Sequence, residues 1–384
     1  MEGDEEMTDL RPDKNIQRVM ISTPAYFVGE FVSEKTLITH AFPQAKDIVE
    51  WQARADVKNN HKRTYYIASF NREPDKDKNI KTSVPDYSWL GEYVSVFLSV
   101  LYGKRFDNHG VIEQNGRFGL PSIRDMRPCK FSEMYFNNSK PRKNLNIELN
   151  LDKVKMIEKM IDLDFEGGKA VDVFYAAAKS YLEALRAIEY DPENAFISLV
   201  MAGEILGDFY RGQFTEDELY DETIRKQFQR IENEINGGDK VVRVLKGRLF
   251  QVKRVFTRVI LKLLSIKFFD GFEGDTAWMA VSVKGIRRNI MSTYDLRSHY
   301  IHTGARFGPF IEPMHLGSEV GGSWVMDDKK LKKLLNNSFT FLGMERVIRF
   351  CLLRFLALNG LIHHEDLTGP GLRDESEASA EAAR

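Results

Sequence analysis

The apolar residues of this chain change their spacing near residue 165, and that change constrains the fold more than any other feature. Beyond it, one stripe recurs at the 3.6-residue period of a helix, at Val171, Phe174, Tyr175, Ala178, Leu182 and Leu185. Before it, short β-rich runs alternate with Gly, Pro, Asn and Asp. The spacing predicts a mainly α chain, with an N-terminal α+β domain over residues 15–150 and a helical bundle over residues 165–360.

The N-terminal part contains several segments with strand patterns. We expect strands over residues 18–22, 26–32, 36–42 and 63–70, and another over 145–151, where leucine and isoleucine alternate with polar residues. Residues 88–101 fit either a helix or a long buried strand, because the spacing of their apolar residues does not distinguish the two. We expect a domain boundary at the polar segment 137–143 and a short helix at 154–161.

Capping residues predict where the first helices of the bundle begin. Asp191 followed by Pro192 favours an N-cap with proline in the first helical position, and Gly212 can end that helix. Thr215 and Glu218 have the spacing of a capping box for the next helix.

Further aspartates predict the later helices. We expect Asp239 to cap a long helix that continues to about Ser265, and Asp275 to cap the helix that follows. Asp327 or Asp328 then begins a last helix, rich in leucine and phenylalanine, that ends at Gly360.

Charge and cysteine usage narrow the class of protein. The net charge of −1 excludes nucleic-acid binding by bulk charge, so any such site is a local patch. Two distant cysteines and short apolar runs predict a cytoplasmic protein without disulfides or membrane spans. The segments 1–14 and 369–384 have the polar composition of disordered tails.

The segment 294–304 (YDLRSHYIHTG) makes the most specific chemical suggestion. It places Arg297 and His302 five residues apart near the end of an expected helix, with Gly304 just beyond. Arginine supplies a fixed positive charge, and histidine exchanges a proton near neutral pH. A helix C-terminus also favours a protonated imidazole. This pair suits the handling of a phosphodiester without a metal ion or other cofactor.

The simplest reaction for such a pair is RNA cleavage by the RNA's own 2′-hydroxyl group. A base removes the hydroxyl proton, a cation stabilises charge on the phosphate, and an acid protonates the leaving oxygen. On a helix the two residues lie about 140° apart around the axis, so one site uses both only in a groove, at a helix end, or between two copies. A homodimer would supply two histidines and two arginines.

The segment Tyr294-Asp295-Leu296-Arg297-Ser298, followed by His302, resembles the signature of the HEPN superfamily (higher eukaryotes and prokaryotes nucleotide-binding), particularly its Apea-like branch. The Leu/Phe-rich last helix and the pattern Ala195-Phe196-x-x-Leu199 leading to Glu204 and Leu206 are also similar. The resemblance covers roughly residues 165–360. It departs from the pattern at Thr303, which stands before Gly304.

The resemblance implies a metal-independent endoribonuclease that acts as a dimer in toxin, anti-phage or stress systems. It implies that Arg297 and His302 are catalytic. Ser298 takes a polar position that is often asparagine in other branches, and Glu204 resembles an acidic residue that orients the site. His299 lies inside the motif as a supporting residue. Some members only bind, so the alternative is a non-catalytic nucleotide-binding, RNA-binding or dimerisation module.

A basic stretch precedes this motif. Residues 225–267 contain twelve Lys or Arg against three acids, which is typical either of a solvated helix face or of a groove for RNA phosphates. The cations that we single out for RNA binding are Arg248, Lys253, Arg254 and Arg258, together with Arg287 and Arg288. We expect no metal site, because the cluster at residues 363–366 lacks ligands from a second element.

Overall fold

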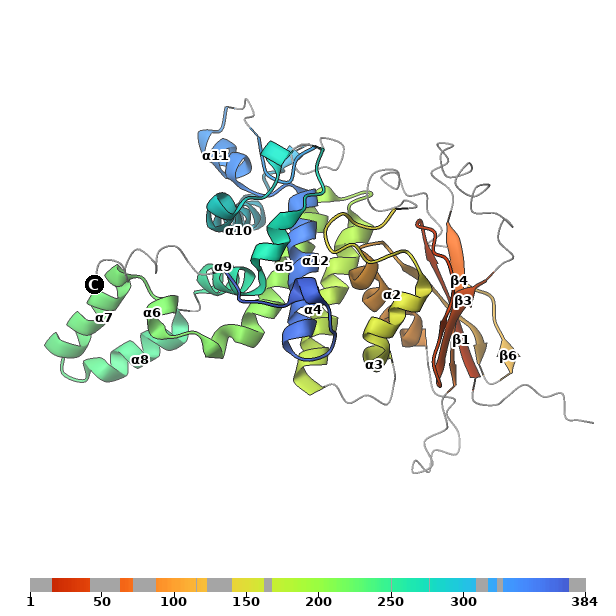
Figure 1. Ribbon diagram of the computed structural model, residues 1–384. Helices are drawn as coiled ribbons and strands as arrows, with labels where there is room; N and C mark the ends of the chain where they lie inside the picture. Colours follow the sequence, from red (N-terminus) through yellow and green to blue (C-terminus); the bar gives the residue numbers. More distant parts are fainter. Residues whose placement is uncertain are drawn as a thin grey trace, which may run out of the picture. The chain divides into compact units, whose positions relative to one another are not determined.

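The computed structural model describes residues 16–41, 63–71, 88–114, 116–122, 140–161, 168–249, 251–275, 277–308, 317–322 and 327–372. The chain divides into two compact units, residues 1–142 with 146–167 and residues 143–145 with 168–384. The first unit contains an antiparallel sheet and the second is helical (Figure 1). The expected tail 1–14 lies outside the described residues, as do residues 373–384 of the expected C-terminal tail. The prediction of disorder is wrong for residues 369–372, because Arg354 donates to the carbonyl of Gly369 and the amide of Leu372 donates to the carbonyl of Leu261.

The first unit is built on a six-stranded sheet with the strand order β2-β3-β4-β1-β5-β6. The strands are β1 (Ile16–Thr23), β2 (Phe31–Val32), β3 (Thr36–His40), β4 (Thr64–Asn71), β5 (Asp107–Gln114) and β6 (Arg117–Phe118). The pattern predicted the first four, with longer bounds for β2 and β3. It missed β5, because the sequence DNHGVIEQ contains few apolar residues.

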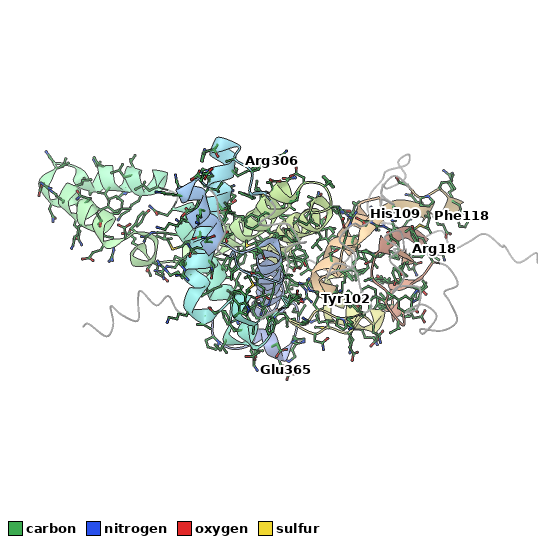
Figure 2. All side chains as sticks on the ribbon, turned by 90° about the horizontal axis from the view of Figure 1, so that it is seen from above. Arg18, Tyr102, His109, Phe118, Arg306 and Glu365 are labelled. Atoms are coloured by element: carbon green, nitrogen blue, oxygen red, sulfur yellow. The ribbon has the colours of Figure 1, made fainter. Side chains whose placement is uncertain are left out.

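Helix α2 (Ser88–Tyr102) packs on β1 and β5, which decides between the helix and the strand that the sequence left open. Its last residue, Tyr102, donates its hydroxyl proton to the carbonyl of Asn150 at 2.8 Å. The ring of Tyr102, labelled in Figure 2, contacts that of Phe27 with centroids 4.5 Å apart, and both residues are buried.

The predicted strand at 145–151 is wrong. Leu145 has a left-handed φ of 51°, and the only sheet-like contact that the segment makes with other described residues is an isolated bridge from Val28 to Asn150. The alternating apolar residues are nevertheless buried, because alternation marks which side chains face inward rather than strand pairing. The helix expected at 154–161 is present as the 3₁₀ helix η2 (Leu151–Ile157) and α3 (Glu158–Ile161).

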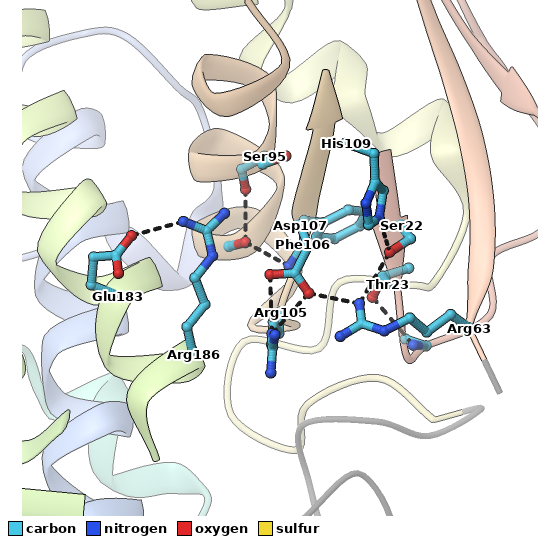
Figure 3. A network of polar contacts seen from close by, with 12 residues as sticks. Ser22, Thr23, Arg63, Ser95, Arg105, Phe106, Asp107, His109, Glu183 and Arg186 are labelled. Atoms are coloured by element: carbon cyan, nitrogen blue, oxygen red, sulfur yellow. Dashed lines mark hydrogen bonds and ion pairs between the residues drawn. The ribbon is translucent and has the colours of Figure 1, made fainter. Parts of the chain in front are cut away.

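A buried polar network links β1 and β5 to the residues that precede β4 and β5 (Figure 3). Ser22 of β1 lies 2.7 Å from Nε2 of His109 in β5 and accepts a hydrogen bond from Arg63 at 3.0 Å. Arg63 and Arg105 both bind the carboxylate of Asp107, at 2.6 and 2.9 Å. The network satisfies charges that would otherwise be costly to bury.

The helical unit contains nine described α-helices. They are α4 (Gly168–Ala187), α5 (Pro192–Tyr210), α6 (Glu216–Leu219), α7 (Glu222–Glu234), α8 (Gly238–Arg248), α9 (Val252–Leu263), α10 (Ile286–Thr303), α11 (Lys329–Asn337) and α12 (Phe341–Leu358). Helices α4, α5, α9 and α12 pack on one another, and α10 packs on α5, α9 and α11. None of the described helices is long and apolar enough to cross a membrane.

Several predicted helix starts are confirmed, whereas Gly212 does not end α5, which stops at Tyr210. The side chain of Asp191 accepts the Asn194 amide at 3.0 Å as α5 begins at Pro192. Thr215 and Glu218 form the expected capping box of α6. Asp328 caps α11.

Three other predictions of helix bounds are wrong. The helix expected to run from Asp239 to Ser265 is two helices, because the backbone breaks before α9 at Gln251, whose φ is 43°. Asp275 does not begin α10, which starts at Ile286. The last helix is divided into α11 and α12, and Thr340 caps the second part.

A buried ion pair joins α12 to the segments before and after α10. Arg346 binds Glu319 at 2.6 Å, and the exposed fractions of the two side chains are 1% and 0%. Glu319 also accepts the backbone amides of Glu273 and Val281, at 2.6 and 2.8 Å. Arg346 donates to two carbonyl groups as well, and its guanidinium lies 4.0 Å from the ring centroid of Phe268.

Candidate active site

Arg297 lies on the side of α10 that faces α5. Its Nη2 donates to Oε2 of Glu204 at 3.2 Å, and the side chains of Arg297 and Glu204 are 25% and 18% exposed. Water therefore screens this pair less than a surface ion pair, and the carboxylate fixes the direction of the guanidinium group. The structure thus places Glu204 beside Arg297, where the resemblance implied an acidic residue.

Tyr294 completes this cluster. Burial and the hydrogen-bonded carboxylate of Glu204 raise the pKa of Tyr294 to about 12. Its ring packs against Phe256 of α9 with centroids 5.4 Å apart, and the guanidinium of Arg297 lies 5.8 Å from the ring centroid. The tyrosine was not among the expected site residues, although its position three before the arginine places both on one helix face.

The close packing of three helices positions the carboxylate. Next to Glu204, a Cβ atom at Gly203 would lie 2.5 Å from the ring of Phe256. Only glycine therefore allows α9 to approach α5 this closely. Phe256 of α9 in turn packs against Tyr294, whose ring lies 5.8 Å from the guanidinium of Arg297.

His302 lies in the last turn of α10 with its side chain exposed. Gly304 ends the helix with φ 68°, and its amide donates to the carbonyl of Tyr300 at 2.8 Å. The chain beyond is anchored by Phe307, whose ring lies 5.2 Å from Tyr300 and 5.5 Å from Phe196 of α5. Among the described residues, the structure gives His302 no polar partner.

The structure does not bring Arg297 and His302 into contact within one chain. Five helical residues separate them by about 7.5 Å along the axis and about 140° around it. Arg297 is turned toward α5, whereas His302 is exposed at the helix end. A group that touches both must lie across the end of α10, or a second copy must supply one of the two.

The supporting residues of the motif occupy different surroundings. Ser298 is half-buried beside Arg297 on α10. Backbone hydrogen bonds from Leu331 and Lys330, together with the nearby charge of His299, lower the pKa of Asp328. His299 therefore lies within electrostatic reach of Asp328, the N-cap of α11.

Three of the six cations expected to bind RNA are paired with acids. These three pair across helices: Lys253 with Asp295 at 2.6 Å, Arg254 with Asp221 at 3.0 Å and Arg258 with Glu218 at 3.8 Å. These acids lie outside residues 225–267, so the local charge excess counted there is partly neutralised. Arg287 and Arg288 are exposed on α10. Arg248 ends α8, and its side chain lies outside the described part of the structure.

The ligand-forming residues are scattered. Across the described ranges, no group of three or more His, Cys, Asp or Glu side chains is close enough together to hold a metal ion. Comparison of the chain with protein-family models, with curated proteins and with solved structures gave no match.

Proposed function

We propose that the helical unit is a HEPN-like domain that cleaves RNA without a metal ion, by attack of the RNA's 2′-hydroxyl group on the adjacent phosphate. The observation that supports this most is the partly exposed guanidinium of Arg297, which Glu204 holds in place. The exposed imidazole of His302 follows five residues later on the same helix. A cation and a proton-transfer group on one helix supply the phosphate binding and one of the two proton transfers that the reaction needs.

In the proposed reaction, His302 transfers protons and Arg297 binds the phosphate. A base takes the proton of the 2′-hydroxyl group, whose oxygen then bonds to phosphorus. The bond to the 5′-oxygen breaks, and an acid gives that oxygen a proton. The products are a 2′,3′-cyclic phosphate and a free 5′-hydroxyl group. One histidine carries out one proton transfer at a time, so a two-fold pair of chains would supply the base and the acid together.

The role of Glu204 follows from its contacts. Glu204 accepts a hydrogen bond from Nη2 of Arg297, and none of the described residues accepts one from Nη1. Nη1 is therefore the part of the guanidinium that can donate to a phosphate oxygen. The carboxylate orients this donor, and the phenol of Tyr294 holds the carboxylate through the shared hydrogen bond.

The second candidate is a non-catalytic module that binds RNA or another chain. The same ion pair favours it, because Glu204 already neutralises the charge of Arg297. The two functions predict different results with purified protein and RNA in the presence of EDTA. The nuclease leaves cyclic phosphate ends, whereas the module binds RNA and leaves it intact.

The decisive experiment compares Arg297→Ala and His302→Ala with matched controls. Arg306→Ala and His363→Ala remove the same side chains at exposed positions outside the cluster. If the proposal is right, the first two variants lose about 10²–10⁴-fold in cleavage rate and the controls keep it. Equal cleavage by all four variants contradicts the assignment. Sedimentation of the active species tests the second part, since full activity in a monomer excludes a shared site.

A further inference from the structure

Helix α11 carries an unusual concentration of positive charge. Four of its nine residues are lysines, and none is an acid. Leu331 and Leu335 are buried, and the helix packs on α10. Three of the lysines are exposed and one is half-buried. We call the four side chains the lysine surface: Lys329, Lys330, Lys332 and Lys333.

The fold leaves the lysine surface without ion pairs. Six cations of α7, α8 and α9 pair with acids: Lys226, Arg230, Lys246, Lys253, Arg254 and Arg258. In the described part of the chain, no acid forms an ion pair with a lysine of α11. Asp328 acts on Lys330 through its charge, but its Oδ1 accepts the backbone amides of Lys330 and Leu331 at 2.8 and 2.9 Å. The four ammonium groups therefore remain open to an outside partner.

These charges also oppose the stability of their own helix. Lys329 and Lys330 occupy its first turn, where the helix dipole favours acids. Lys329 and Lys333 are four residues apart, a spacing at which like charges repel. A helix of nine residues has little stability of its own. A ligand therefore explains this arrangement better than folding does.

Contacts with α10 place the lysine surface next to the proposed site (Figure 1). The side chain of Asn289, early in α10, donates to the carbonyl of Asn337, the last residue of α11, at 2.8 Å. At the other end, His299 lies within electrostatic reach of Asp328. The two helices are therefore antiparallel, and α11 begins beside the last turn of α10. His302 follows His299 by three residues, so the two are neighbours on the helix surface.

We propose that the lysine surface binds the phosphate backbone of RNA and holds the strand beside the end of α10 that carries His302. This inference rests on the proposed function, because RNA is the polyanion on which His302 would act. Lysine is a flexible point charge, so binding depends on phosphates rather than on base sequence. Each lysine that neutralises a phosphate releases a counterion, and binding therefore weakens as salt rises.

Two other anionic partners fit the lysine surface less well. Helices that bind membranes expose an apolar face beside their cations, but the described part of α11 exposes no large apolar side chain. Protein interfaces are depleted in lysine and enriched in aromatic residues, and α11 contains no aromatic residue. The surface therefore suits a hydrated polyanion such as RNA.

Binding of 2′-O-methylated single-stranded RNA tests the proposal apart from cleavage, because this RNA has no 2′-hydroxyl group to attack. The α11 variant changes the four residues of the lysine surface to glutamine. A matched control changes four exposed lysines of other elements to glutamine, Lys155, Lys159, Lys169 and Lys179, so that both variants have the same net charge. Glutamine forms helices about as well as lysine, so both variants should fold.

The α11 variant should bind this RNA roughly 10–100-fold more weakly than the unaltered chain at about 0.15 M salt. The slope of log affinity against log salt should fall by roughly 2–3, whereas the control should keep both the slope and the affinity within about twofold. The Tm of the α11 variant should not fall, because the substitutions remove repulsion. If that variant does not fold, Lys329→Gln with Lys333→Gln should give about half the change in slope.

Unchanged binding in the α11 variant, or an equal loss in the control, overturns the proposal. Polyglutamate and phosphatidylserine vesicles serve as the competing probes. Binding of either probe that requires the four lysines and that RNA does not displace also overturns it.

Cleavage of unmethylated RNA separates this proposal from the nuclease activity. If both are right, the α11 variant raises KM and keeps kcat, whereas His302→Ala lowers kcat. An unaltered chain that binds methylated RNA through the four lysines but never cuts RNA supports the surface and refutes the nuclease. Full cleavage with an unchanged KM in the α11 variant refutes the surface and leaves the nuclease intact.

Discussion

Replacing Arg346 with methionine should destabilise the helical unit more than any surface change. The substitution keeps the apolar stem but removes the partner of Glu319, a side chain with an exposed fraction of 0%. It also removes the donor to the carbonyls of Phe268 and Gly271. Leaving one charge of a buried pair unpaired costs about 3–5 kcal/mol, and each lost hydrogen bond adds about 1 kcal/mol.

The expected loss is smaller than the sum of these figures, because Glu319 retains two backbone amide donors. We therefore expect the free energy of unfolding to fall by about 4–6 kcal/mol. Natural domains have only about 5–15 kcal/mol in total, so the variant should be close to unfolding at 37 °C. For a unit of this size the loss corresponds to a decrease in Tm of roughly 8–24 °C.

Urea unfolding followed by circular dichroism measures the change, with exposed Arg306→Met as a matched control expected to stay within about 0.5 kcal/mol. Glu319→Gln alone should cost about 3 kcal/mol. The double variant should lose at least about 1 kcal/mol less than the sum of the single losses, because the pair interacts directly. A loss below about 1 kcal/mol in Arg346→Met, or strict additivity, refutes the argument that this pair holds the segments together.

Three further predictions concern other contacts. The pKa of Tyr294 is raised to about 12, so its phenol stabilises the folded state below pH 10. This stabilisation is lost as the pH rises from 10 to about 12. The urea midpoint should therefore fall less over this pH range in Tyr294→Phe than in the unaltered chain. Gly203→Ala should cost about 1–3 kcal/mol in urea unfolding, because its Cβ would lie 2.5 Å from Phe256, whereas Gly212→Ala, which meets open space, should change stability by less than about 0.5 kcal/mol. Asp191→Ala should cost about 1 kcal/mol by the same method, since it removes the N-cap of α5, and an unchanged midpoint would contradict that role.

Local chemistry made parts of the fold predictable from the sequence. Asp191 with Pro192, and Thr215 with Glu218, each satisfy backbone groups within a few residues, so their patterns predicted helix starts correctly. The break at Gln251 was not predictable, because its left-handed φ arises where α8 turns into α9 and the residue itself carries no breaking signal.

Long-range pairing explains most of what the sequence could not indicate about the site. Glu204 and Arg297 are 93 residues apart, and only the packing of α5 against α10 brings them together. The excess of cations in residues 225–267 suggested an open basic face. A count of charges within one stretch of sequence overlooks acids outside that stretch. In the folded chain, Asp295 forms an ion pair with Lys253.

The two edge strands of the described β-sheet, β2 and β6, are each only two residues long. Beside β2, the chain at Val28 exchanges backbone hydrogen bonds with residues 149–151, which occupies amide and carbonyl groups that another polypeptide could otherwise use. A short or covered edge strand offers few unpaired backbone groups with which a strand of another chain could pair. Concentrated solutions of this protein should therefore resist fibril growth seeded from the described part of its sheet.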